Sequence, residues 1–237
     1  MIKARALLLA AGCGTRLKPL TDSTPKCLVQ IGEYRLLEYW VNNLIRAGIT
    51  EAVINTHYLR KEIQAYIEKI NLDHSLQITE SYEPVLLGSA GTVTNNKHIA
   101  ENAKCIVIIY ADNLSSIEIS EILDFHQSHN QPLTMALFHA EHPRKCGIAS
   151  LDKNGLVSDF VEKPDNPEGN LANAGIYVLD TDAYERVAVM NAFDFGFDVL
   201  PRLIGQIKGY IHEGYHRDIG TLPSLDQARS DVENGLF

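Results

Sequence analysis

The stretch Leu-Leu-Leu-Ala-Ala-Gly-Cys-Gly-Thr-Arg-Leu-Lys-Pro-Leu-Thr, residues 7–21, followed closely by Pro25-Lys26, decides the fold of this chain. An apolar run ends in a glycine-rich turn, and Arg16, Lys18 and Lys26 follow within a few residues. A strand fixes such a loop, glycines let backbone N–H groups approach phosphate oxygens, and cations balance the phosphate charge. The stretch therefore predicts a triphosphate site at the end of the first strand.

The distribution of charge supports a small anionic ligand. The first 30 residues carry five basic side chains and one acidic one, whereas the whole chain has a formal net charge of −9. A positive patch on an otherwise acidic protein suits a small anion and argues against a nucleic-acid surface. The loop lacks the third glycine of the dinucleotide fingerprint, which disfavours a Rossmann-type dehydrogenase, and it also lacks the Walker pattern.

Length and composition indicate one ordinary globular domain. The 237 residues are 45% hydrophobic and 22% charged, and we expect a single domain over 1–237 with halves of about 1–115 and 116–237. No run approaches 18 consecutive apolar residues and the N-terminus does not resemble a secretion signal, so we expect no membrane contact. The cysteines are widely spaced, which predicts reduced thiols in a cytoplasmic protein.

Apolar periodicity predicts an α/β fold. Strands are expected at 4–9, 51–55, 76–79 and 104–111, alternating with helices at 36–45, 59–70 and 117–129. The second half is expected to be richer in antiparallel strands, at 133–139, 147–151, 157–162 and 175–179. This order predicts a mixed, mostly parallel central sheet, with ligands beyond the carboxyl ends of its strands.

The opening stretch resembles the signature of the sugar-1-phosphate nucleotidyltransferases, roughly L-A-A-G-x-G-T-R-L-x-P-L-T, a short gap, then P-K. The resemblance implies a single-domain Rossmann-like nucleotidyltransferase fold and transfer of a nucleotidyl group from an NTP to a sugar 1-phosphate. It implies a catalytic Arg16 at the β- and γ-phosphates and a catalytic Lys26 at the α-phosphate. It also implies nucleotide contacts for Leu9, Ala11, Gly12, Gly14 and Thr15. Several relatives carry a C-terminal β-helix, which we do not expect because the chain ends soon after Asp218.

A second glycine-rich segment, Glu-Pro-Val-Leu-Leu-Gly-Ser-Ala-Gly-Thr, spans residues 83–92. Taken alone, it is a hairpin or the loop at the start of a helix. The family places a similar segment against the base and the sugar, which implies nucleotide contacts for Gly88 and Ala90 and base reading by Glu83. A carboxylate only accepts hydrogen bonds, so it suits the two N–H donors of guanine better than the single imide N–H of uracil or thymine. We therefore expect GTP, as in the mannose-1-phosphate guanylyltransferase branch.

Two aspartates are candidates for holding a cation. Asp112 directly follows the most apolar strand, where a carboxylate can hold a hard cation or simply serve as a turn residue. The resemblance implies a catalytic Asp112 that binds Mg²⁺ together with Asp218. Ala111 stands where the family usually has glycine, and His216 stands where it commonly has an aromatic residue.

Two later strings complete the resemblance, Glu162-Lys163-Pro164 and Asn173-Ala174-Gly175. In the family this glutamate accepts sugar hydroxyls, the lysine contacts the sugar phosphate and the asparagine binds the sugar. The substrates implied are an NTP and a sugar 1-phosphate used for polysaccharide precursors. The identity of the sugar and the oligomeric state stay open. The alternatives are a phosphocholine cytidylyltransferase of the same fold, uridylyl or thymidylyl transfer, and a non-catalytic subunit that binds a nucleotide sugar.

Overall fold

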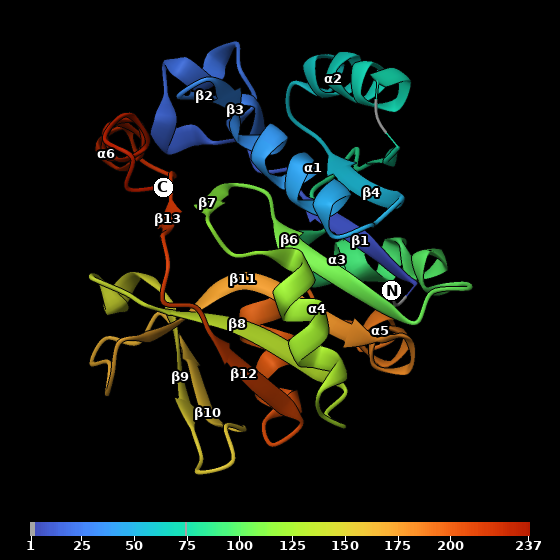
Figure 1. The fold of residues 1–237 in the computed structure, drawn as a ribbon, viewed down its shortest axis with the longest axis vertical. Helices are drawn as coiled ribbons and strands as arrows, with labels where there is room; N and C mark the ends of the chain where they lie inside the picture. Colours follow the sequence, from blue (N-terminus) through green and yellow to red (C-terminus); the bar gives the residue numbers. More distant parts are fainter. Residues whose placement is uncertain (1–2, 74) are drawn as a thin grey trace.

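A computed structural model describes residues 3–73 and 75–237. Its centre is a nine-stranded sheet (Figure 1). Seven of its strands follow the order β10-β9-β11-β6-β1-β4-β5. The other two lie off this path, because β8 pairs with β11 and β12 pairs with β8. The α/β prediction with a mixed central sheet is confirmed. Within the residues described, no helix is long and apolar enough to cross a membrane.

The first half of the sheet consists of four strands that pair in parallel: β1 (Ala4–Leu9), β4 (Glu51–Thr56), β5 (Gln77–Tyr82) and β6 (Cys105–Tyr110). The three inner strands β1, β4 and β6 are rich in buried aliphatic residues because helices cover both of their faces, whereas the edge strand β5 buries only Ile78. Their carboxyl ends share one edge, where the loop after β1 and the segment after β6 lie side by side. Three of the four predicted ranges agree within a residue, whereas β5 begins one residue later and extends three residues beyond 79.

The second half of the sheet is mainly antiparallel. As predicted, β8 (Leu133–His139), β9 (Gly147–Leu151) and β10 (Val157–Glu162) have the expected bounds, while β11 (Leu171–Asp180) begins four residues earlier than expected. It pairs antiparallel to β6, β8 and β9 and so joins the two halves. An additional strand, β12 (Ile207–Ile211), pairs in parallel with β8.

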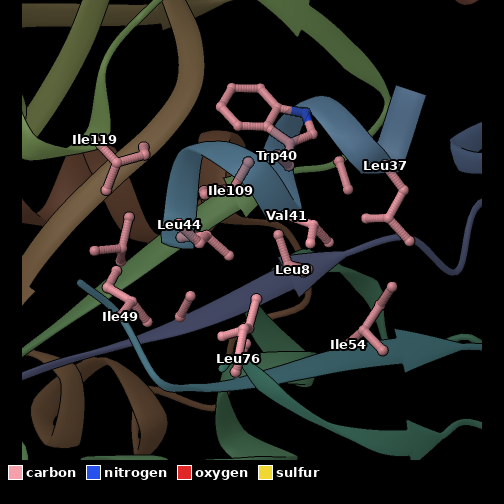
Figure 2. Packing of buried hydrophobic residues seen from close by; sticks show 14 of the residues in the cluster. Leu8, Leu37, Trp40, Val41, Leu44, Ile49, Ile54, Leu76, Ile109 and Ile119 are labelled. Atoms are coloured by element: carbon pink, nitrogen blue, oxygen red, sulfur yellow. The ribbon is translucent and has the colours of Figure 1, made fainter. Parts of the chain in front are cut away.

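Helices cover both faces of the sheet. One face lies under α1 (Leu36–Arg46), α2 (Arg60–Asp73) and α4 (Ile119–Gln127), and the other lies under α3 (Gly88–Asn95) and α5 (Thr181–Ala188). The apolar residues of α1 recur at helical spacing, and Trp40 and Leu44 pack over Leu8 of β1 (Figure 2). Each such buried side chain contributes about 1.5–3 kcal/mol. A glycine with positive φ, Gly48, follows α1, as its sequence predicts.

A third, smaller cluster forms beside the loop after β1. It joins α6 (Leu222–Glu233), the hairpin of β2 (Gln30–Ile31) and β3 (Tyr34–Arg35), and the ladder of β7 (Asn113–Ser115) with β13 (His216–Asp218). Leu17, Leu114 and Ile219 from these distant segments are all buried in it. The pairing of β13 with β7 sets Asp218 opposite Asn113. This ladder is the reason why two aspartates far apart in sequence meet at one edge of the fold.

Candidate active site

The loop after β1 leaves β1 at Ala10 and is held open by one side chain. Asn55, at the carboxyl end of β4, accepts the backbone N–H groups of Ala10 and Ala11 at 2.6 and 3.2 Å. Gly12 is exposed, and nothing lies within 4 Å of the position that a Cβ would occupy there. A ligand can therefore approach the backbone at Gly12 without meeting the protein's own atoms.

The glycine at position 14 closes the loop. Gly14 has a φ of 60°, and its carbonyl accepts the hydroxyl of Thr21 at 2.8 Å. An exposed Thr15 then begins a single helical turn, Thr15–Leu17, and no α-helix follows before α1. The positive end of a helix is thus not what would attract phosphate here, so the attraction must come from backbone N–H groups and nearby cations.

The main cation of the site is Lys26, which bridges the two aspartates. Its Nζ lies 2.8 Å from Asp112 Oδ2 and 2.9 Å from Asp218 Oδ1, and its side chain is 8% exposed. Burial alone would lower the pKa of Lys26, but the two carboxylates outweigh burial and raise it. Burial also works to raise the pKa of Asp218, and there the ammonium of Lys26 outweighs it and lowers the pKa. The lysine is therefore a firmly charged counter-ion.

The two aspartates fit a hard divalent cation. Their carboxylates converge on one positively charged nitrogen, and their side chains are 41% and 56% exposed, so a hydrated ion can reach them. No group of three or more acidic, histidine or cysteine side chains placed to hold a metal occurs among the described residues. Two carboxylates, with substrate phosphates and water as the remaining ligands, are what Mg²⁺ commonly takes in such sites. The guanidinium of Arg16 lies beside Gly220, 2.8 Å from the position of an added Cβ, and its charge also lowers the pKa of Asp218.

The second glycine-rich segment is bound to the protein itself. Glu83 is 1% exposed, and its Oε1 accepts hydrogen bonds from Asn55 Nδ2 at 2.9 Å and Thr92 Oγ1 at 2.5 Å. Its Oε2 accepts the backbone N–H of Leu87 at 3.1 Å. The carboxylate therefore fixes the segment and retains about one unused acceptor position of its roughly four. Pairing with both N–H donors of guanine would need two unused acceptor positions on Glu83, and only about one is unused.

Two further expectations for this segment have different outcomes. Gly88 begins α3 with a φ of 75° and lines the cavity described below. Ala90, two residues later, is buried, and its N–H is donated to the carbonyl of Phe193 at 3.0 Å. The structure thus places Ala90 behind the cavity wall, where it supports the wall and does not contact the cavity.

One cavity of about 350 Å³ joins the two glycine-rich segments. It contains seven of the residues implied by the sequence, namely Leu9, Ala11, Gly12, Lys26, Glu83, Gly88 and Asp112. Asn55, Leu86 and Phe193 also line it and were not identified from the sequence. The signal for Asn55 was present, because a polar residue at the carboxyl end of a buried parallel strand is the same signal that indicated Asp112. Gly14, Thr15, Arg16 and Asp218 lie outside this lining, at the loop and beside Lys26.

The residues expected at the sugar lie on the neighbouring strands and are not among the described lining residues of this cavity. Glu162, at the end of β10, is largely buried, which raises its pKa, while the ammonium of Lys163 acts in the opposite direction. Lys163 has a φ of 49° and points its side chain largely to solvent. Asn173 is engaged internally, donating to Tyr177 Oη at 2.6 Å and accepting the N–H of Gly175 at 3.0 Å. The implied sugar contacts thus lie at the end of β10 and on β11, two strands separated by β9, with Asn173 already bonded within β11.

Comparison with known proteins identifies the family. The chain is 28% identical to a glucose-1-phosphate adenylyltransferase of Acetivibrio thermocellus over 96% of its own length and 59% of that protein. It is 30% identical to the mannose-1-phosphate guanylyltransferase catalytic subunit beta of Drosophila melanogaster over 91% of its length and 59% of that protein. The chain thus spans about three fifths of the length of these relatives.

A solved structure shows the same fold. This crystal structure, described as a glucose-1-phosphate thymidylyltransferase from Bacillus anthracis, superposes with a TM-score of 0.85 at 22% identity, covering 96% of this chain and 94% of the other. The sequence profile of the nucleotidyl transferases matches residues 5–235. The chain therefore belongs to the nucleotidyl transferase family.

Proposed function

We propose that this protein transfers a nucleotidyl group from an NTP to a sugar 1-phosphate, producing a nucleoside-diphosphate sugar and pyrophosphate. The observation that carries the proposal is the bridge of Lys26 to Asp112 and Asp218 at the mouth of an open glycine loop. It gathers one buried cation and two carboxylates where a triphosphate would meet an acceptor. Relatives named for adenylyl or guanylyl transfer to sugar 1-phosphates support the same reaction class.

The reaction needs positioning and charge neutralisation more than acid–base chemistry. An oxygen of the sugar phosphate attacks the α-phosphorus in line, and the bond to the bridging oxygen of the β-phosphate breaks, so pyrophosphate leaves with the electron pair. The second pKa of a phosphate monoester is about 6, so the nucleophile is already ionised at neutral pH and needs no general base. The rate then depends on alignment and on the stabilisation of phosphate charge.

The basic residues divide that task. Arg16 would hold the β- and γ-phosphates with its forked donors, and Lys163 would neutralise the sugar phosphate. Lys26 would stabilise the charge at the α-phosphate, because its flexible stem lets Nζ turn from the carboxylates to an incoming oxygen. Asp112 and Asp218 would hold Mg²⁺, which when bound supplies further neutralisation of the phosphates.

We propose GTP as the preferred nucleotide. Glu83 lines the cavity as a carboxylate with about one acceptor position left on Oε2, which one of the two adjacent N–H donors of guanine could use. Because only about one acceptor position is unused, the amino group of adenine would satisfy Glu83 almost as well. Adenylyl transfer is therefore the second candidate.

The proposal is tested by pyrophosphate release with Mg²⁺, crossing GTP, ATP, UTP, dTTP and CTP against sugar 1-phosphates and phosphocholine. The expected result is release with GTP and a sugar 1-phosphate such as mannose 1-phosphate. Release only with ATP, UTP or dTTP would retain the reaction class and reject the guanine argument. Release with CTP and phosphocholine would reassign the acceptor. If folded protein binds an NTP but releases no pyrophosphate with any pair, a non-catalytic binding role replaces the enzyme.

A further inference from the structure

Two aromatic side chains stand exposed on the segment after α5. Phe193 is 62% exposed and Phe197 is 58% exposed, although they follow a well-packed helix. Of these two, Phe193 lines the cavity, together with the partly exposed Leu86. A large aromatic ring held in solvent at the rim of a cavity is a typical ligand contact.

The backbone beneath this ring is fixed from two sides. The N–H groups of Phe193 and Asp194 both donate to Asp198 Oδ2, at 2.9 and 2.8 Å. The carbonyl of Phe193 accepts the N–H of Ala90 at 3.0 Å, and the N–H of the residue two positions later, Phe195, donates to Ser89 Oγ at 2.7 Å. The ring is therefore presented by a rigid segment that is bound to α3, and its exposure is a fixed feature of the fold.

The ring lies in the part of the cavity walled by Glu83. Its Cδ1 is 3.0 Å from the position that a Cβ would have on Gly88, and the N–H of the preceding Leu87 is donated to Glu83 Oε2. The residues implied for the sugar, including Glu162 and Lys163, are not among the described lining residues of this cavity. A planar group entering beside Glu83 would thus meet the face or edge of Phe193.

We propose that Phe193 is a stacking surface for the nucleobase, an inference that rests on the proposed binding of an NTP in this cavity. Stacking of a base on an aromatic side chain tolerates any base, because every base has a π-face. Phe193 therefore supplies affinity, and Glu83 supplies the choice among bases. The second half of the chain, in this arrangement, contributes a wall of the nucleotide site.

The test compares Phe193→Ala with Phe197→Ala, a matched loss of an equally exposed ring four residues away. Dissociation constants for GTP and ATP with Mg²⁺, and KM values for the sugar 1-phosphate, are measured on folded protein. We expect Phe193→Ala to weaken the binding of both NTPs about 5- to 150-fold, the range typical of lost stacking. We expect little change in the KM for the sugar 1-phosphate in Phe193→Ala. Phe197→Ala should retain wild-type affinity for both NTPs, and only its NTP affinity serves as the control, because the centre of the Phe197 ring lies 6.0 Å from Lys163 Nζ.

A second variant gives a spectroscopic readout. The single tryptophan of the chain, Trp40, is buried in the core. In Phe193→Trp we expect NTP affinity within a few-fold of wild type, and quenching of the exposed indole fluorescence by GTP.

Each of four results would overturn the inference alone. NTP affinity could be unchanged in Phe193→Ala, or that variant could affect only the KM for the sugar 1-phosphate. Phe197→Ala could lose as much NTP affinity as Phe193→Ala, or the indole fluorescence of Phe193→Trp could stay unquenched although the variant binds GTP. Failure of the folded wild type to bind any NTP would overturn the proposed function and this inference together.

Discussion

The two glycine-rich segments of the cavity use glycine for opposite purposes. At Gly12, after β1, an added Cβ would meet nothing within 4 Å. At Gly88, an added Cβ would lie 2.3 Å from the carbonyl oxygen of Phe193, and the φ of 75° is itself unfavourable for other residues. The first glycine leaves room for a ligand, whereas the second leaves room for the protein's own chain.

The polar groups around the two segments differ in their exposure. The first is followed by the exposed Arg16 and by Lys26, which pairs with Asp112 and Asp218, two carboxylates that are themselves 41% and 56% exposed. The second is built around Glu83, whose carboxylate already accepts three hydrogen bonds from the protein. The comparison teaches that a glycine-rich motif locates a cavity wall but does not say whether its groups are free to bind. Changes near the first segment should therefore mainly affect catalysis, whereas changes in the second should affect folding as well as nucleotide binding.

The largest effect is expected at Lys26. Removing one well-positioned group that stabilises charge typically costs about 3–4 kcal/mol, or a factor of roughly 10²–10³ in rate. We expect Lys26→Ala to lose pyrophosphate release on that scale while circular dichroism shows folded protein. The control is Lys18→Ala, because Lys18 pairs with Asp22 on the surface at 3.0 Å, and this variant should retain normal turnover. Near-normal turnover of folded Lys26→Ala would contradict the roles assigned to the first segment.

A matched pair of glycine substitutions separates the two segments directly. We expect Gly88→Ala to lower the free energy of unfolding by about 1–3 kcal/mol, because the added Cβ would clash with the carbonyl of Phe193 and the φ of 75° is unfavourable for alanine. We expect Gly12→Ala to change that free energy by less than about 0.5 kcal/mol and to raise the KM for the NTP. Urea denaturation and initial rates measure both. The reverse pattern would mean that the segments have exchanged roles.

The smallest effect concerns the pH dependence of stability at Glu80, on the strand β5 that leads to the second segment. Hydrogen bonds from Arg60 lead the interactions that lower the pKa of Glu80, and Thr56 and Gln64 add to them. Since the folded pKa lies below the unfolded one, this carboxylate contributes stability above its ordinary pKa of about 4.3 and loses it as the pH falls through the folded value. Arg60 is 40% exposed, so we expect Glu80→Gln to cost about 1 kcal/mol or less at pH 7.

This pH prediction is checked by chemical denaturation of wild type and Glu80→Gln between pH 3 and pH 7. The difference in unfolding free energy should shrink toward zero on acidification, with NTP binding at pH 7 unchanged in the variant. A difference that grows on acidification would contradict it.

Much of the fold follows from the sequence, and its limits have physical causes. The buried parallel strands β1 and β6 are nearly continuous apolar runs, so their positions could be predicted to within a residue. For α3 the sequence alone predicts only a hairpin or the start of a helix, because Gly88 and Gly91 are weak helix formers. The helix is stabilised instead by a tertiary contact, the hydrogen bond from Ala90 N–H to the carbonyl of Phe193. The short strands β7 and β13 carry too few residues for a periodic signal, although they bring Asp218 to Asp112.

The sequence predicts a site residue correctly only where its place depends on the strand or loop that carries it, and not on contacts from other elements. Asp112 could be placed at the carboxyl edge of the sheet from the sequence, and Gly12 in the loop after β1. The hydrogen bonds of Glu83 depend on Asn55 and Thr92, which approach it from other elements. The exposure of Phe193 likewise depends on Asp198 and Ala90 holding its backbone. Such contacts become visible only in three dimensions.

The contrast between the two segments is tested most directly by amide hydrogen exchange, with and without Mg²⁺ and the NTP that supports the fastest turnover. We predict that the nucleotide slows exchange across residues 12–16, where the backbone lies open, and changes it little at Ala90, whose N–H is already bonded to Phe193. New protection confined to residues 88–92, with none at 12–16, would contradict the account.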